Sequence, residues 1–179
     1  MQESIPTTVE HLSRRFSIGL PGSYDVVRSR FERLVPIVDY AAFAAAHNWQ
    51  EAVMAADDSA PYGFMRYYRA DIAAALADSP SQGRATEYLM GNHVIAEQMF
   101  RHDPAVMLHA PLRVVIHTDD SGATRLVVDQ PSLLFASYGR AEISAVGKHL
   151  DDLLARLITL LGGRVPPALA ASSALSARL

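Results

Sequence analysis

The chain has 179 residues, of which 50% are hydrophobic and 20% charged, with a formal net charge of −3 and a mean hydropathy of +0.08. This length and apolar content predict one folded domain, because they suffice for a single core. The absence of cysteine excludes disulfides and thiolate metal sites, and the bulk charge lacks the basic excess that is typical of nucleic-acid binding.

Residues 1–15 are polar and lack the apolar segment of a secretory signal. No apolar run approaches the roughly 20 residues that a membrane-spanning helix needs. We therefore expect a cytoplasmic protein that binds neither a membrane nor a nucleic acid. We expect residues 1–14 to form a mobile arm, residues 15–162 a single α+β domain, and residues 163–179 a disordered tail of alanine, proline and serine.

The first predicted elements are a strand and two helices. Phe16 and Ile18 alternate with Ser17 and glycine, which indicates a short strand over 15–20. Ser23 is a favourable N-cap for the next helix, and Pro36 ends that helix because proline lacks an N–H and clashes with the preceding turn. The alanine-rich residues 37–56 predict a second helix, which the polar segment 57–61 closes.

Strands and short helices alternate in the middle of the chain. Residues 62–71 and 86–91 predict strands, with a helical turn over 72–77 and a loop over 78–83 between them. Asn92 is a favourable cap for a helix over 93–102, which Asp103-Pro104 interrupts. Residues 112–118 and 124–129 predict a hairpin, which residues 130–132 end.

The clearest pattern is a long amphipathic helix near the C-terminus. Asp151 and three other charged residues fall outside its apolar stripe, which comprises Ile143, Val146, Leu150, Leu153, Leu154, Leu157, Ile158 and Leu161. Gly162-Gly163 ends this helix. The order of elements predicts the α+β class: a two-layer sandwich in which a mainly antiparallel sheet carries helices packed on one face.

A set of short motifs between residues 88 and 132 indicates a family. Gly91-Asn92 opens a helix, Asp103-Pro104 follows it, and then come the runs 108–115 (LHAPLRVV) and 129–132 (DQPS). In these motifs the chain resembles the widespread bacterial domain-of-unknown-function family number 302, over residues 62–161. The resemblance implies an antiparallel sheet backed by helices and a homodimer, and it implies no activity and no catalytic residue.

Histidines offer one kind of candidate site. His93 and Glu97 are one helical turn apart, a spacing that suits a divalent metal, and His117 would be a third ligand if the fold brought it close. In the alternative interpretation, His93 helps to cap its helix and Glu97 is solvated. A haem site would use His93, His102 or His109 with the neighbouring Met99, Phe100, Met107 and Leu108, although apolar residues at this spacing are also typical of a core.

A second kind of candidate site lies on the predicted sheet. Its polar and aromatic residues are Arg66, Tyr68, Arg113, His117 and Asp129, with Asn92 beside His93 as a further contact. If the strands adjoin, this composition suits a small anionic or aromatic ligand. A dimer interface and a plain solvated face remain alternatives.

No catalytic or nucleotide-binding motif is present, and His117 with Asp129 is the one acid–base pairing that the pattern offers. We therefore predict a homodimeric protein that binds a small ligand or a partner without catalysis. The alternative is a metal- or haem-binding protein with a redox or sensing role that uses His93 and its neighbours.

Overall fold

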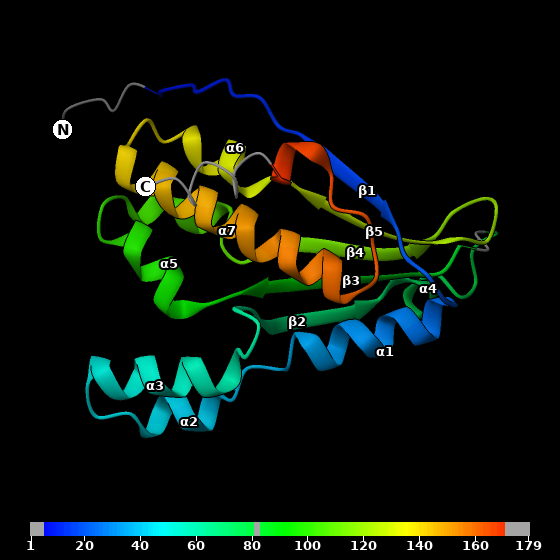
Figure 1. Ribbon diagram of the computed structural model, residues 1–179, viewed down its shortest axis with the longest axis horizontal. Coiled ribbons are helices and arrows are strands. Elements are labelled where there is room, and N and C mark those ends of the chain that lie inside the picture. Colours follow the sequence, from blue (N-terminus) through cyan, green and yellow to red (C-terminus); the bar gives the residue numbers. More distant parts are fainter. Residues whose placement is uncertain (1–5, 81–82, 171–179) are drawn as a thin grey trace.

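The computed structural model describes residues 6–80 and 83–170. Within them, five strands form one antiparallel sheet in the order β1-β5-β4-β3-β2 (Figure 1). The strands are β1 (Arg15–Gly19), β2 (Met65–Asp71), β3 (Ala85–Gly91), β4 (Leu112–Thr118) and β5 (Thr124–Asp129). The predicted α+β class with a mainly antiparallel sheet is confirmed.

Helices occupy most of the remaining chain. They are α1 (Tyr24–Leu34), α2 (Tyr40–Ala45), α3 (Trp49–Ser59), α4 (Ile72–Ala75), α5 (His93–Phe100), the 3-10 helix η1 (Pro104–Leu108), α6 (Pro131–Ala136) and α7 (Ala141–Leu160). In the described residues, none of these helices is long and apolar enough to span a bilayer. The predicted long amphipathic helix near the C-terminus is present as α7.

One helix prediction was wrong. Residues 37–56 form two helices, because Asn48 accepts a hydrogen bond from Glu51 N (3.0 Å) and Glu51 accepts one from His47 N (2.7 Å). This reciprocal capping starts α3 afresh after a turn. Residues 130–132 end the hairpin as predicted, and they also begin α6, since Pro131 occupies the first helical turn, where its missing N–H has no cost.

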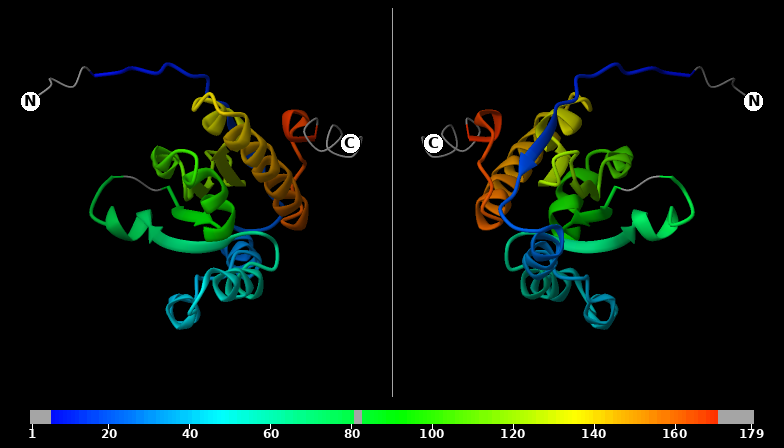
Figure 2. Two further views of the ribbon diagram at one scale, coloured as in Figure 1. Left: turned by 90° about the vertical axis from the view of Figure 1, so that its left-hand side faces the viewer. Right: turned by 90° about the vertical axis from the view of Figure 1, so that its right-hand side faces the viewer.

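The helices cover one face of the sheet. Alternate strand residues on that face are buried, and α7 crosses it with α1 alongside (Figures 1 and 2). The shared core includes Phe16, Ile18, Val27, Phe31, Tyr88, Met90, Val114, Ile116, Leu126, Val128, Leu150 and Leu154. This arrangement is the predicted two-layer sandwich, and the opposite face, hereafter the open face, has no fully buried residue on β1, β3, β4 or β5.

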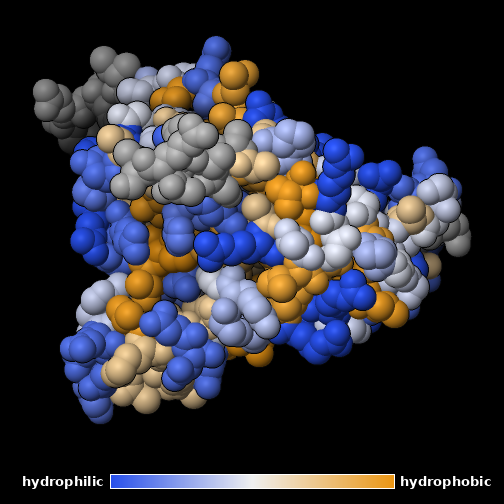
Figure 3. All heavy atoms as spheres, in the orientation of Figure 1, coloured by the Kyte–Doolittle hydropathy of each residue, from blue (hydrophilic) through white to orange (hydrophobic). Residues whose placement is uncertain are grey.

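The α2–α3 pair lies beyond the β2 edge of the sheet. A small second cluster joins it to the body through Val38, Ala56, Ala60 and Met65. In Figure 3 this pair forms a pale, alanine-rich area at the lower left, whereas hydrophilic residues lie over the middle of α7. Trp49 and Met54 are about half exposed on this pair.

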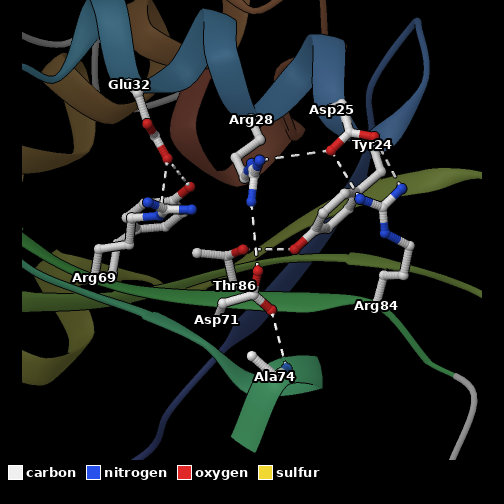
Figure 4. Close-up of polar contacts among 10 residues, drawn as sticks. Tyr24, Asp25, Arg28, Glu32, Arg69, Asp71, Ala74, Arg84 and Thr86 are labelled. Atoms are coloured by element: carbon white, nitrogen blue, oxygen red, sulfur yellow. Dashed lines mark hydrogen bonds and ion pairs between the residues drawn. The ribbon is translucent and has the colours of Figure 1, made fainter. Parts of the chain in front are cut away.

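Charged residues of α1 are paired with the edge of the sheet (Figure 4). Arg84 holds Asp25 through two hydrogen bonds of 2.7 and 3.0 Å, and Arg28 reaches Asp25 and Asp71. Tyr88 donates a hydrogen bond from its hydroxyl to Glu32 (2.9 Å). Burial of the Tyr88 hydroxyl, together with this hydrogen bond, raises the pKa of Tyr88. Arg28 and Arg84 are thus each paired with carboxylates of the same chain.

The C-terminal segment differs from expectation in the part that is described. Residues 163–170 were predicted to belong to a disordered tail, but Leu169 is fully buried in the main core. The segment 164–167, with Pro166 and Pro167, lies beside β1. The predictions for residues 1–5, 81–82 and 171–179 fall outside the described residues.

Candidate functional site

A β-bulge in β2 divides the predicted polar face. The register shifts between Arg66, which pairs with Met90, and Tyr68, which pairs with Leu89. Because an extra residue in one strand reverses the side on which the following side chains emerge, Tyr68 lies on the open face and Arg66 does not. Arg66 instead donates from Nε to the carbonyl of Val35 (2.9 Å).

Four of the predicted residues do share the open face: Tyr68, Arg113, His117 and Asp129. Leu89 pairs with both Tyr68 and Arg113, so these three residues form one row across the sheet. Asp129 follows Val128 at the same end of β5, whereas His117 pairs with Arg125. His117 is therefore about 14 Å along the strands from the Arg113 end, at about 3.4 Å per residue. The structure does not bring His117 and Asp129 together as an acid–base pair.

A groove lies where this row meets η1 and the loop that follows it. Its volume is about 530 Å³. Its lining residues are Leu89, Met107, Leu108, His109, Ala110, Pro111, Leu112, Arg113, Val128, Asp129 and Leu134. Apolar side chains predominate, and His109, Arg113 and Asp129 supply the polar groups, so the groove has the composition of a small-molecule site.

Rings surround His109 in the wall of this groove. Phe135 and Tyr138 approach its ring edge-on, at centroid distances of 6.3 and 6.1 Å, and His11 of the N-terminal segment does so at 5.9 Å. Burial and the neighbouring His11 lower the pKa of His109, and Asp129 opposes them. His109 is therefore held mainly as a neutral ring at pH 7.

Arg113 is the most accessible cation of the groove. Its side chain is 74% exposed, and its Nε lies 3.0 Å from Glu87 Oε1. The side chain of Asp129 is 43% exposed, and its Oδ1 lies 3.9 Å from Arg15 Nε. An acidic ligand group can thus reach the guanidinium fork from solvent.

His93 contacts Tyr67 and Phe43 instead of the predicted metal ligands Glu97 and His117. The Tyr67 hydroxyl lies 2.9 Å from His93 Nδ1, and the ring of Phe43 lies 4.5 Å from the imidazole. Burial lowers the pKa of His93 and raises that of Tyr67. Glu97 is occupied by an ion pair with Arg101.

This geometry does not support the predicted metal site. Across residues 6–80 and 83–170, His, Asp and Glu nowhere gather in a group of three or more that could hold a metal ion. Asn92 also has a structural role: its Oδ1 accepts from Val94 N (2.9 Å) at the start of α5, and its Nδ2 donates to Gly63 O (3.3 Å). Among the histidines considered for haem, His109 alone lines the groove.

Sequence reasoning missed the wall that η1 provides. Asp103 caps this short helix by accepting from Ala105 N (2.9 Å), and Pro104 occupies its first turn. The pair was read as a helix break, although Asp-Pro is also a signal for a new helical start. That start leaves Met107 and Leu108 exposed, at 46% and 82%, beside the groove.

A buried carboxylate was also missed. Asp151 was placed outside the apolar stripe, yet it is 0% exposed. It accepts from Gln130 Nε2 (2.7 Å), Ser132 N (2.9 Å) and Ser132 Oγ (2.6 Å). Arg14 extends this network by donating to Gln130 Oε1 (2.8 Å). The run 129–132 therefore ties α6 and the N-terminal segment to α7.

Comparisons with known proteins agree with this fold. The crystal structure of an uncharacterized conserved protein DUF302 from Bacillus stearothermophilus is similar, with a TM-score of 0.61 and 11% identity, covering 82% of this chain and 97% of that one. At this identity the likeness shows the fold alone. None of the curated proteins matches the chain. The family model described as Domain of unknown function DUF302 matches residues 43–161, which is more than half of the chain. The resemblance found in the sequence is thus confirmed, and the chain belongs to the DUF302 family.

Proposed function

We propose that this protein binds a small ligand with an apolar body and one acidic group, in the groove between η1 and the open face. The observation that carries the proposal is a groove of about 530 Å³ whose apolar walls converge on an exposed arginine. Pockets for small molecules typically have volumes of about 300–1,000 Å³ with few polar groups. The Leu89, Leu108 and Pro111 side chains supply the apolar walls.

The two edges of the sheet are poorly suited to an alternative role in binding a partner strand. At the β2 edge, Arg66 N donates to Pro36 O (2.7 Å) and Val38 N donates to Arg66 O (2.9 Å), so this end of the edge is already paired. At the β1 edge, the proline-containing segment 164–167 lies beside the strand. Both arrangements hinder the addition of a partner strand.

Arg113 gives the groove its preference for an acid. A guanidinium presents a planar fork of donors that matches a carboxylate or sulfonate. Glu87 and Asp129 flank it, so a ligand with several negative charges would meet like charges there. We therefore expect a monoanion with an aromatic or aliphatic body and no reaction at the site.

A fluorescent aromatic sulfonate, anilinonaphthalene sulfonate, tests this proposal at pH 7.5. We expect saturable binding that weakens about tenfold in Arg113→Gln, as the loss of one charge-assisted contact predicts. Arg33→Gln, which removes an exposed arginine of α1, is the matched control and should leave the affinity unchanged. Equal weakening in both variants, or no saturable binding, would refute the groove as an anion site.

Native mass spectrometry and an absorption spectrum of the purified protein test the competing cofactor hypothesis. A retained organic acid supports the proposal. A Soret band or a stoichiometric metal would replace it with the haem or metal alternative, and the loss of that signal in His109→Ala or His93→Ala would then locate the cofactor.

We also propose a homodimer, formed through the part of the open face around Val115 and Val127, neither of which lines the groove. The partly exposed Val115 and Val127 lie at the centre of this face, with Tyr68 48% exposed on β2. The ion pairs Arg15–Asp129, Arg113–Glu87 and Arg125–Asp119 neutralise charges within the chain. Native mass spectrometry should give twice the chain mass, and Val127→Arg should give a folded monomer. An unchanged dimer in Val127→Arg would place the interface elsewhere.

A further inference from the structure

The N-terminal segment 6–14 lies beside the groove. It leaves β1 and passes α6 on its way to the N-terminus (Figures 1 and 2). Its base is clamped: Gln130 N donates to Arg14 O (2.8 Å), and Arg14 Nη1 donates to Gln130 Oε1 (2.8 Å). Because Gln130 also bonds the buried Asp151, this clamp is anchored in the core.

Three residues before Arg14, His11 contacts a residue of the groove wall, His109. Its ring packs edge-on against His109, with a centroid distance of 5.9 Å, and His109 lines the groove. The neighbouring Val9 and Leu12 are apolar but 67% and 82% exposed. The segment is thus attached at its base and, near its middle, by an imidazole pair.

We propose that residues 6–14 form a strap at the rim of the groove, docked through the contact of the His11 ring with the neutral ring of His109 and released when His109 is protonated. The strap would bring Val9 and Leu12 to the apolar body of a bound ligand. This role in ligand binding rests on the proposed function of the groove, whereas the pH-dependent docking does not.

The direction of the pH dependence follows from the surroundings of His109. His11 of the strap, Asp129 of β5, Arg113 of β4 and Tyr138 after α6 are the titratable and charged groups of the described residues around it. Burial and His11 lower the pKa of His109 in the docked state, so protons favour release. Docking is therefore complete above about pH 6.5, the ordinary value for histidine, and is lost as the pH falls further. Asp129 favours protonated His109 but faces Arg15 as well.

A spin label on the strap measures docking without any ligand. The chain has no cysteine, so Leu12→Cys gives one labelling site on an exposed side chain. Between pH 8 and pH 5, we expect the ratio of immobile to mobile label to fall severalfold, because burial and the neighbouring His11 both oppose the charged form of His109. His11→Phe keeps a ring at the contact and removes the group that lowers the pKa of His109, so its label should stay immobile at both pH values.

His47→Phe is the matched control, since His47 is exposed between α2 and α3 and should leave the response unchanged. Equal mobility at both pH values, or an undiminished response in His11→Phe, would overturn the strap. The NMR titration of the His109 imidazole provides a second measurement: its midpoint should rise in His11→Phe, and an unchanged midpoint would contradict the pairing. If the label responds but the aromatic sulfonate does not bind, the groove proposal fails and the docking stands.

Discussion

Replacing Asp151 with asparagine tests whether a buried carboxylate, and not merely a residue of that size, fastens α6 to α7. Asparagine keeps the volume of the side chain, so the packing around it should not change. Either orientation of its amide, however, brings an NH₂ group against a donor: Gln130 Nε2 on one side or Ser132 N on the other. Turning the Gln130 amide would restore one contact but would set its NH₂ against Arg14.

The magnitude follows from the contacts. Hydrogen bonds to a charged group contribute about 1.5–3 kcal/mol each, and at least one must be lost with its donor left buried. We expect the free energy of unfolding to fall by about 2–4 kcal/mol, a large fraction of the roughly 5–15 kcal/mol that a domain possesses. For a chain of this length, that loss lowers Tm by about 4–16 °C.

Urea denaturation at pH 7.5, followed by circular dichroism, measures the effect. Asp57→Asn removes an exposed carboxylate of α3 and serves as the control, with an expected change within about 0.5 kcal/mol. A loss below about 0.5 kcal/mol in Asp151→Asn would refute the reasoning, because it would mean that the three donors are satisfied equally well by a neutral amide.

Three further substitutions separate packing from binding. Leu169→Ala should reduce the free energy of unfolding by about 2–3 kcal/mol, since Leu169 is fully buried; an unchanged urea midpoint would mean that the C-terminal segment does not pack. Gly63→Ala should cost about 1–2 kcal/mol in the same assay, because Gly63 has φ +88° and a Cβ would approach Leu153 to 2.8 Å; wild-type stability would contradict this left-handed backbone. Leu108→Ser should leave stability within about 0.5 kcal/mol, as its side chain is 82% exposed, and should weaken binding of the aromatic sulfonate; unaltered binding would remove Leu108 from the ligand site.

The sequence predicted the elements whose signals are local. The alternation of apolar and polar residues predicted β1, the β-branched segments around a turn predicted the β4–β5 hairpin, and the 3.6-residue period of apolar residues predicted α7. Asn92 was read correctly as a cap, whereas Ser23 occupies the N-cap position of α1 without a hydrogen bond from its side chain. The same local reasoning failed over 37–56, where a capping pair within the alanine-rich run outweighs helix propensity.

The site depended on information that no local pattern contains. Strict alternation placed Arg66 and Tyr68 on one face, but the bulge in β2 separates them. The spacing of His93 and Glu97 suggested a metal, whereas Tyr67 and Arg101 occupy these side chains from other positions. Local periodicity cannot reveal Tyr67, because the packing of β2 beside α5 brings it to His93. Arg101, in contrast, is one helical turn from Glu97, and this pairing could have been read from the sequence.

By itself, the sequence determined the class of the fold, the family and the buried stripe of α7, since hydrophobic period, turn residues and short motifs act over a few neighbouring positions. The tertiary structure alone decided which polar residues meet: the groove between η1 and the open face, the burial of Asp151 and the contact of His11 with His109. His11 and His109 are 98 positions apart, and only the folding of β1 against β5 brings their rings to 5.9 Å.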